Sequence, residues 1–176
     1  MESLDHSVLR DALAWHQGGY RVSLVTVVQT WGSAPRPPGA LLAIRDDGVV
    51  SGSVSGGCVE DDLIARTQTS LRSHASAPEP DKPAVIAYGV TQEEAARFGL
   101  PCGGSLRLVQ ETLLDASWVA QLLARIEQHQ LVVRTLDMTS GAVQLQDAAR
   151  GQTLQFDGAT LTSRSEERRV GKECRL

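Results

Sequence analysis

The sequence predicts a mixed α/β domain of the α+β kind, in which a mixed sheet contains a β-hairpin and helices flank the sheet. Apolar residues recur with a helical period in several segments, and β-branched residues are concentrated in short runs between them. Two of these runs flank Asp46-Asp47-Gly48, a sequence typical of a hairpin turn. Part of the sheet is therefore expected to be antiparallel.

The helices follow from apolar spacing and from capping residues. Leu4, Val8 and Ala12 share one helical face, and the paired glycines at 18–19 end that helix. Thr91 and Glu94 form a capping box, which predicts that a helix begins there. The expected helices cover residues 4–15, 58–74, 91–98 and 115–129.

The strands follow from β-branched composition and from turn residues around them. Residues 21–30 are apolar on both faces, so this strand should be largely buried. The other expected strands cover residues 40–45, 49–54, 84–90 and 105–110. Three more form a β-meander at residues 131–138, 143–146 and 153–156.

Composition excludes several functional classes. The chain has 176 residues and a formal net charge of −4, which disfavours nucleic-acid binding because such binding needs a basic face. No apolar run reaches the ~20 residues of a membrane span, and no signal peptide is recognisable. We therefore expect a cytoplasmic protein with reduced cysteines. One domain is expected at residues 1–163, with motifs in 24–111 and a helix plus meander in 115–163. Residues 164–176 have the character of a non-native tail, so we expect no functional role for Cys174.

Glycine, proline and cysteine concentrate in the loops between these elements. Ser55, Gly56, Gly57 and Cys58 precede a helix, where free N–H groups favour an anion or a thiolate. Glu60 and its acidic neighbours Asp61 and Asp62 oppose both. A buried, inert cysteine in a tight turn therefore remains an alternative.

Two further segments have a similar character. The segment Pro101-Cys102-Gly103-Gly104 places a second cysteine beside paired glycines, although taken alone it is better explained as a helix C-cap. If the two cysteine loops meet, they form a pocket with two thiols. Arg36 lies between prolines and suits phosphate or carboxylate, unless it is only a surface arginine. Trp31 could flank a ring ligand, but core packing is the favoured interpretation.

Three ordered motifs, TWGSAPRPPGA, DGVVSGSVSGGCVEDDL and LPCGGSLRLVQE, closely resemble the N-terminal domain of the XdhC/CoxI family. Longer family members have a second, Rossmann-like domain, which we expect to be absent here, so the chain would be truncated. The resemblance implies a cofactor-binding role for the matched positions. These are Gly32, Ser33, Pro35, Arg36, Gly39, Ser55, Gly56, Gly57, Cys58, Glu60, Cys102, Gly103 and Gly104.

The resemblance implies an accessory chaperone rather than an enzyme, with no catalytic residue assigned. Its cargo would be the molybdenum cofactor, as molybdopterin or a dinucleotide form. Cys58 and Cys102 would contact the molybdenum or a transferred sulfur. The implied partners are a molybdenum hydroxylase such as apo xanthine dehydrogenase, a cysteine desulfurase and a second copy of the chain. Two alternatives are a thiol-dependent enzyme acting on a phosphorylated or persulfidated small molecule and a structural dimerisation domain.

Overall fold

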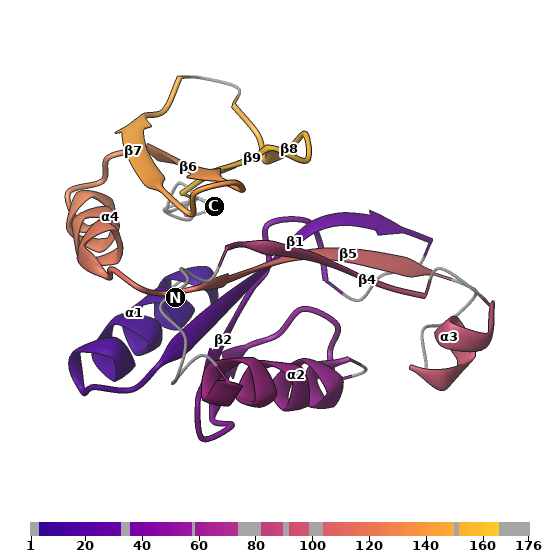
Figure 1. Ribbon diagram of the computed structural model, residues 1–176. Coiled ribbons are helices and arrows are strands. Elements are labelled where there is room, and N and C mark those ends of the chain that lie inside the picture. The colour runs from indigo at the N-terminus through magenta and orange to yellow at the C-terminus, as the bar shows by residue number, and fades with distance from the viewer. Residues whose placement is uncertain are drawn as a thin grey trace, which may run out of the picture.

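The protein contains two antiparallel sheets and helices that pack around them (Figure 1). The computed structural model describes residues 4–32, 36–57, 59–73, 82–89, 92–98, 104–149 and 152–165. The helices are α1 (Leu4–Gln17), α2 (Glu60–Ser73), α3 (Gln92–Arg97) and α4 (Ser117–Glu127). The strands are β1 (Val22–Trp31), β2 (Leu41–Arg45), β3 (Val50–Gly52), β4 (Ala84–Tyr88), β5 (Ser105–Thr112), β6 (Val132–Asp137), β7 (Val143–Asp147), β8 (Gln155–Phe156) and β9 (Thr160–Arg164).

The first sheet has the order β3-β2-β1-β5-β4, with the buried strand β1 in the centre. Val25 and Val27 of β1 project from one face and pack with Leu63 of α2 in one core cluster. Val22 and Leu24 project from the opposite face and pack with residues of α1 and α4. Strand β1 is apolar on both faces because both faces are covered, as the sequence predicted.

The second sheet, with the order β7-β6-β9-β8, lies over the face of the first sheet opposite α2 (Figure 1). Val28 and Val109 of the first sheet pack with Leu136 and Leu161 of the second. Glu111 and Arg134 form a buried ion pair between the two sheets, with an Arg134 Nη2 to Glu111 Oε2 distance of 2.5 Å.

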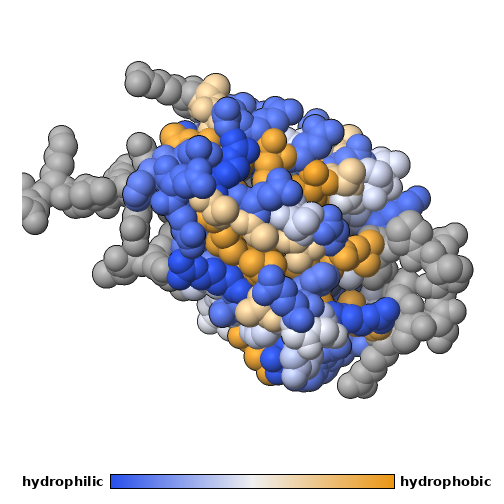
Figure 2. Space-filling view, turned by 90° about the vertical axis from the view of Figure 1, so that its left-hand side faces the viewer, coloured by the Kyte–Doolittle hydropathy of each residue, from blue (hydrophilic) through white to orange (hydrophobic). Residues whose placement is uncertain are grey.

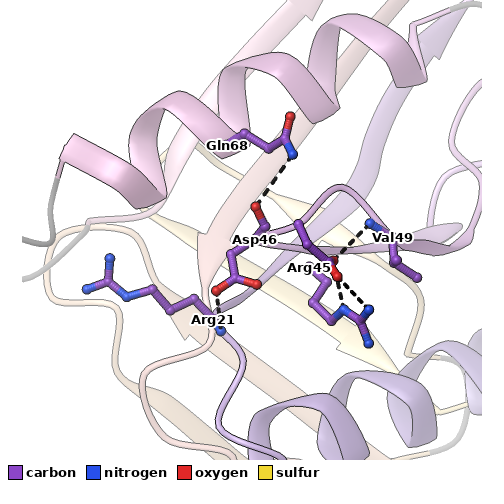
Figure 3. Close-up of polar contacts among 6 residues, drawn as sticks. Arg21, Arg45, Asp46, Val49 and Gln68 are labelled. Atoms are coloured by element: carbon purple, nitrogen blue, oxygen red, sulfur yellow. Dashed lines mark hydrogen bonds and ion pairs between the residues drawn. The ribbon is translucent and has the colours of Figure 1, made fainter.

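The predicted hairpin turn between β2 and β3 is present and is tied to its surroundings (Figure 3). The Asp46 carboxylate accepts the backbone N–H of Arg21 at 3.3 Å. The Gln68 side chain of α2 donates to the Asp46 carbonyl at 3.5 Å. Arg45 donates two hydrogen bonds to Asp47, at 2.8 and 2.6 Å. This turn lies at the end of the sheet where β1 begins, because Val22 pairs with Arg45.

The predicted α+β class is confirmed, with two corrections. Every strand pair in the described part of the chain is antiparallel, so the expected mixed sheet is wrong in this detail. The expected β-meander is replaced by two hairpins joined through β6 and β9. Strand β9 was not predicted, because its polar sequence becomes a strand only through its pairing with β6.

The surface shown in Figure 2 carries both apolar and hydrophilic residues. Figure 2 shows apolar side chains gathered in the middle of one face, with hydrophilic residues around them, on the side where α1 and α4 lie in Figure 1. Within the described ranges, no helix has the length and apolar character needed to cross a bilayer.

Candidate functional site

The first motif, TWGSAPRPPGA, and the third motif, LPCGGSLRLVQE, meet where β1 ends and β5 begins. Trp31 pairs with Ser105, and the residues beside them, Gly32 and Gly104, approach closely. Gly32 has a φ of +72°, and a Cβ atom at this position would lie 3.1 Å from the Gly104 Cα. Both the backbone conformation and this approach therefore require glycine at position 32.

Arg36 connects the first motif to the second. Its half-buried side chain donates a hydrogen bond from Nε to the Ser53 carbonyl at 3.3 Å. The surrounding loop is closed by the Gly39 N–H, which donates to the Val27 carbonyl at 2.8 Å. This Nε contact is the only hydrogen bond of the guanidinium to the described part of the chain. Its two terminal nitrogens donate to no described residue.

Glu60, the first residue of α2, organises the second motif. Its Oε1 atom accepts hydrogen bonds from Ser53 Oγ at 2.7 Å, Val54 N at 3.1 Å and Ser55 N at 3.0 Å. Its Oε2 atom accepts from Gly57 N at 3.0 Å, from Val59 N at 3.3 Å and from the Ser55 hydroxyl. A single carboxylate thus holds the backbone on both sides of position 58.

The Glu60 carboxylate stays ionised. Its partial burial raises the pKa, but hydrogen bonds donated by Ser55 and Ser53 outweigh this effect and lower the pKa to about 2. The two neighbouring glycine donors are also engaged, since the Gly56 N–H donates to Ser53 Oγ at 2.9 Å and the Gly57 N–H to Glu60. The glycine N–H groups expected to bind an anion are therefore satisfied by the loop itself.

The other two residues of the acidic triplet have different environments. Asp62 accepts hydrogen bonds from the Tyr88 hydroxyl and from Arg66 Nε, each at 2.6 Å. These contacts tie the first turn of α2 to β4 and, against the opposing effect of partial burial, lower the pKa of Asp62. Asp61 is exposed. The sequence placed three acids beside a loop expected to hold an anion or a thiolate. Two of these acids instead have hydrogen-bond partners within the fold, which accounts for their presence there.

Several predicted site residues lie outside the described ranges, namely Ser33, Pro35, Cys58, Cys102 and Gly103. The expected meeting of the two cysteines therefore stays a prediction. The remaining candidates lie toward the end of the five-stranded sheet where β1 ends; Gly32, Arg36, Gly39, Ser55, Gly56, Gly57 and Gly104 are in loops, and Glu60 begins α2. In the described portion, no three His, Cys, Asp or Glu side chains form a group that could hold a metal ion.

Trp31 and Arg107 lie near this site but were not among the predicted site residues. Trp31 was expected to pack in the core, but it is 48% exposed. Arg107 pairs with Gln29 on β1, two residues from Trp31, and its guanidinium lies 5.4 Å from the centre of the Phe156 ring. The position of Trp31, last in a buried strand and directly before glycine, was the signal for its exposure.

Comparisons with known proteins agree with the motifs. The sequence model of the XdhC and CoxI family matches residues 15–80. The molybdenum cofactor insertion chaperone PaoD of Escherichia coli strain K12 is 37% identical over 131 residues, which cover 73% of this chain and 38% of PaoD. A structure described as a xanthine dehydrogenase from Bacillus halodurans has the same fold, with a TM-score of 0.65 and 19% identity.

That structural match covers 91% of this chain and 52% of the solved chain. The chain thus spans about half or less of the length of these two relatives. The motifs, the family match and the identity to PaoD agree with one another, and the chain belongs to the XdhC and CoxI family.

Proposed function

We propose that the chain is the cofactor-binding part of an accessory factor that binds molybdenum cofactor, assists its sulfuration and promotes its insertion into a molybdenum hydroxylase such as xanthine dehydrogenase. The observation that carries this proposal is the contact of the first motif with both others, through Gly32–Gly104 and Arg36–Ser53. The name of PaoD, a molybdenum cofactor insertion chaperone, supports the same role.

Arg36 binds the terminal phosphate of the cofactor in this proposal. Its Nε is held by the Ser53 carbonyl, which orients the planar guanidinium and leaves the Nη atoms for a bidentate contact. Glycines 56 and 57 do not serve this purpose, because Glu60 and Ser53 occupy their N–H groups. The glycines instead allow the tight path of the loop, with φ values of +74° and +109°.

Cys58 and Cys102 supply the soft ligands in this proposal. Thiolates suit molybdenum and also carry a sulfur atom as a persulfide. Glu60 positions the backbone around Cys58, since it accepts the N–H groups of both neighbours, Gly57 and Val59. The partners that follow are a cysteine desulfurase as sulfur donor and the apo-hydroxylase as acceptor, with a second copy of the chain completing the binding surface.

The test is quantification of molybdenum and pterin retained by the protein purified with and without molybdopterin. We expect retention by the wild type, loss in Cys58→Ala and Cys102→Ala, and weaker binding in Arg36→Gln. Arg10→Gln is the matched control, because it removes an arginine from an exposed ion pair with Glu127 on the surface of α1. Equal retention by all four variants would refute the assigned site.

The same preparations distinguish the alternative functions. Catalytic turnover of a phosphorylated or persulfidated small molecule would indicate a thiol-dependent enzyme instead of a chaperone. A stable dimer that retains no pterin, even in the wild type, would indicate a structural dimerisation domain. Stoichiometric retention of the cofactor, followed by its transfer to an apo-hydroxylase, is the result that the proposed function requires.

A further inference from the structure

We propose that the exposed indole of Trp31 is a stacking platform for the planar pterin ring of the cargo, an inference that rests on the proposed function. Trp31 is the last residue of β1, and 48% of it is exposed. A large aromatic side chain left half in water at the end of a buried strand is stabilised when a flat aromatic ring stacks on it.

Trp31 differs from every other aromatic residue of the chain. Among the described residues it alone contacts neither a second ring nor a cation. Each of the other six aromatic rings contacts another ring or an arginine, and these are Trp15, Tyr20, Tyr88, Phe98, Trp118 and Phe156. Within the described ranges, the other aromatic rings therefore have a ring or an arginine as a partner, and the Trp31 indole has neither.

The described neighbours of Trp31 where β1 ends are small. Its neighbour Gly32 and the facing Gly104 have no side chains, and their backbones are in close approach. The pairing of Trp31 with Ser105 places its side chain on the same face of the sheet as Gln29 and Arg107, since alternate residues share a face. Trp31 thus lies beside two glycines and shares its face of the sheet with polar and cationic residues.

The charges nearby indicate which kind of ring binds. Arg36 follows five residues later in the chain, with its Nε bonded to the Ser53 carbonyl, and Arg107, which contacts the Phe156 ring, lies on the same face of the sheet as Trp31. An exposed indole with one arginine on its face of the sheet and another in the loop that follows fits a planar heterocycle that carries a phosphate group. These charges do not fit the apolar surface of a second protein. The pterin and phosphate of the proposed cargo combine both features.

The test measures pterin binding by variants of this one position. We expect Trp31→Ala to bind molybdopterin about 10-fold more weakly or worse, the loss typical of removing one stacking aromatic. Trp31→Phe should retain binding within a few-fold of the wild type, because a ring remains. Leu114→Ala is the matched control, since Leu114 is also apolar and 63% exposed but lies outside the motifs. Its binding should not change.

A spectroscopic measurement separates stacking from a structural effect. Pterin should quench the tryptophan emission of the wild type and of Trp15→Phe but not that of Trp31→Phe. Unchanged binding by Trp31→Ala, while the wild type binds, would overturn the proposal. A change in oligomeric state without a change in pterin binding would also overturn it and assign the indole to a protein interface. If the wild type itself retains no molybdopterin, the proposed function fails. In that case, 6-hydroxymethylpterin is the probe. If it quenches the tryptophan emission of the wild type but not that of Trp31→Phe, stacking at Trp31 is still supported. If it does not quench the wild type, the stacking proposal is overturned.

Discussion

Replacement of Glu60 by alanine tests the central claim about the second motif, that one carboxylate holds the loop before α2. The substitution removes the acceptor of six hydrogen bonds, four of which come from backbone N–H groups. We expect the loop to lose its order and the protein to lose stability and cargo binding, because N–H groups left without acceptors are costly.

The size of the effect follows from the pKa of Glu60. A fall from 4.5 to about 2 corresponds to at most about 3–4 kcal/mol of stability, at about 1.4 kcal/mol for each tenfold change. Glu60 is partly exposed, so solvent screening reduces this contribution to about 1–2 kcal/mol. The alanine variant also leaves donors unsatisfied, and we expect a total loss of about 2–3 kcal/mol.

The pH dependence has a defined sign. The folded-state pKa of Glu60 is depressed, so its contribution is complete above about pH 4.5 and is lost as the pH falls toward 2. Other acids, among them Asp62, have lowered pKa values and add their own acid dependence. The informative quantity is therefore the difference in unfolding free energy between the wild type and Glu60→Gln, which should shrink between pH 5 and 2.5.

The assay is urea denaturation followed by circular dichroism at several pH values. Asp61→Asn is the matched control, because it removes the same charge from the same helical turn at an exposed position. It should change the unfolding free energy by less than about 0.5 kcal/mol. A wild-type to Glu60→Gln difference that stays constant with pH, or equal effects at both positions, would refute the reasoning.

Two further predictions concern the contacts that join parts of the chain. Gly32→Ala should lower the free energy of unfolding by about 2 kcal/mol and abolish cargo binding, because its Cβ would push the Gly104 backbone away. Gly158→Ala is the control, because Gly158 also has a positive φ but has open space around it; it should cost about 1 kcal/mol and leave binding intact. Thermal unfolding and pterin retention measure the two effects. Arg134→Met should cost about 3–5 kcal/mol in chemical denaturation, because it leaves the Glu111 carboxylate buried without its partner. Adding Glu111→Leu should recover most of that loss, and a double variant as unstable as the single one would contradict this account.

The sequence by itself determined the elements and the motifs. The four helices and the strands of the first sheet lie where apolar period, capping residues and the Asp-Gly turn predicted them, because these signals act over a few neighbouring residues. The role of Glu60 was within reach of the same local reasoning, since its donors lie within seven positions of it. Its negative charge disfavours a bound anion, but the same charge suits the N–H and O–H donors of the loop itself.

Only the tertiary structure decided which motifs meet and which residues stay exposed. The contact of Gly32 with Gly104 joins segments that are distant in sequence, and it depends on the pairing of β1 with β5. The same pairing leaves Trp31 at an open end of the sheet instead of in the core. Strand β9 likewise exists through its partner β6 and not through its own composition. Strand pairing is a non-local choice, and no pattern within a single segment encodes its partner.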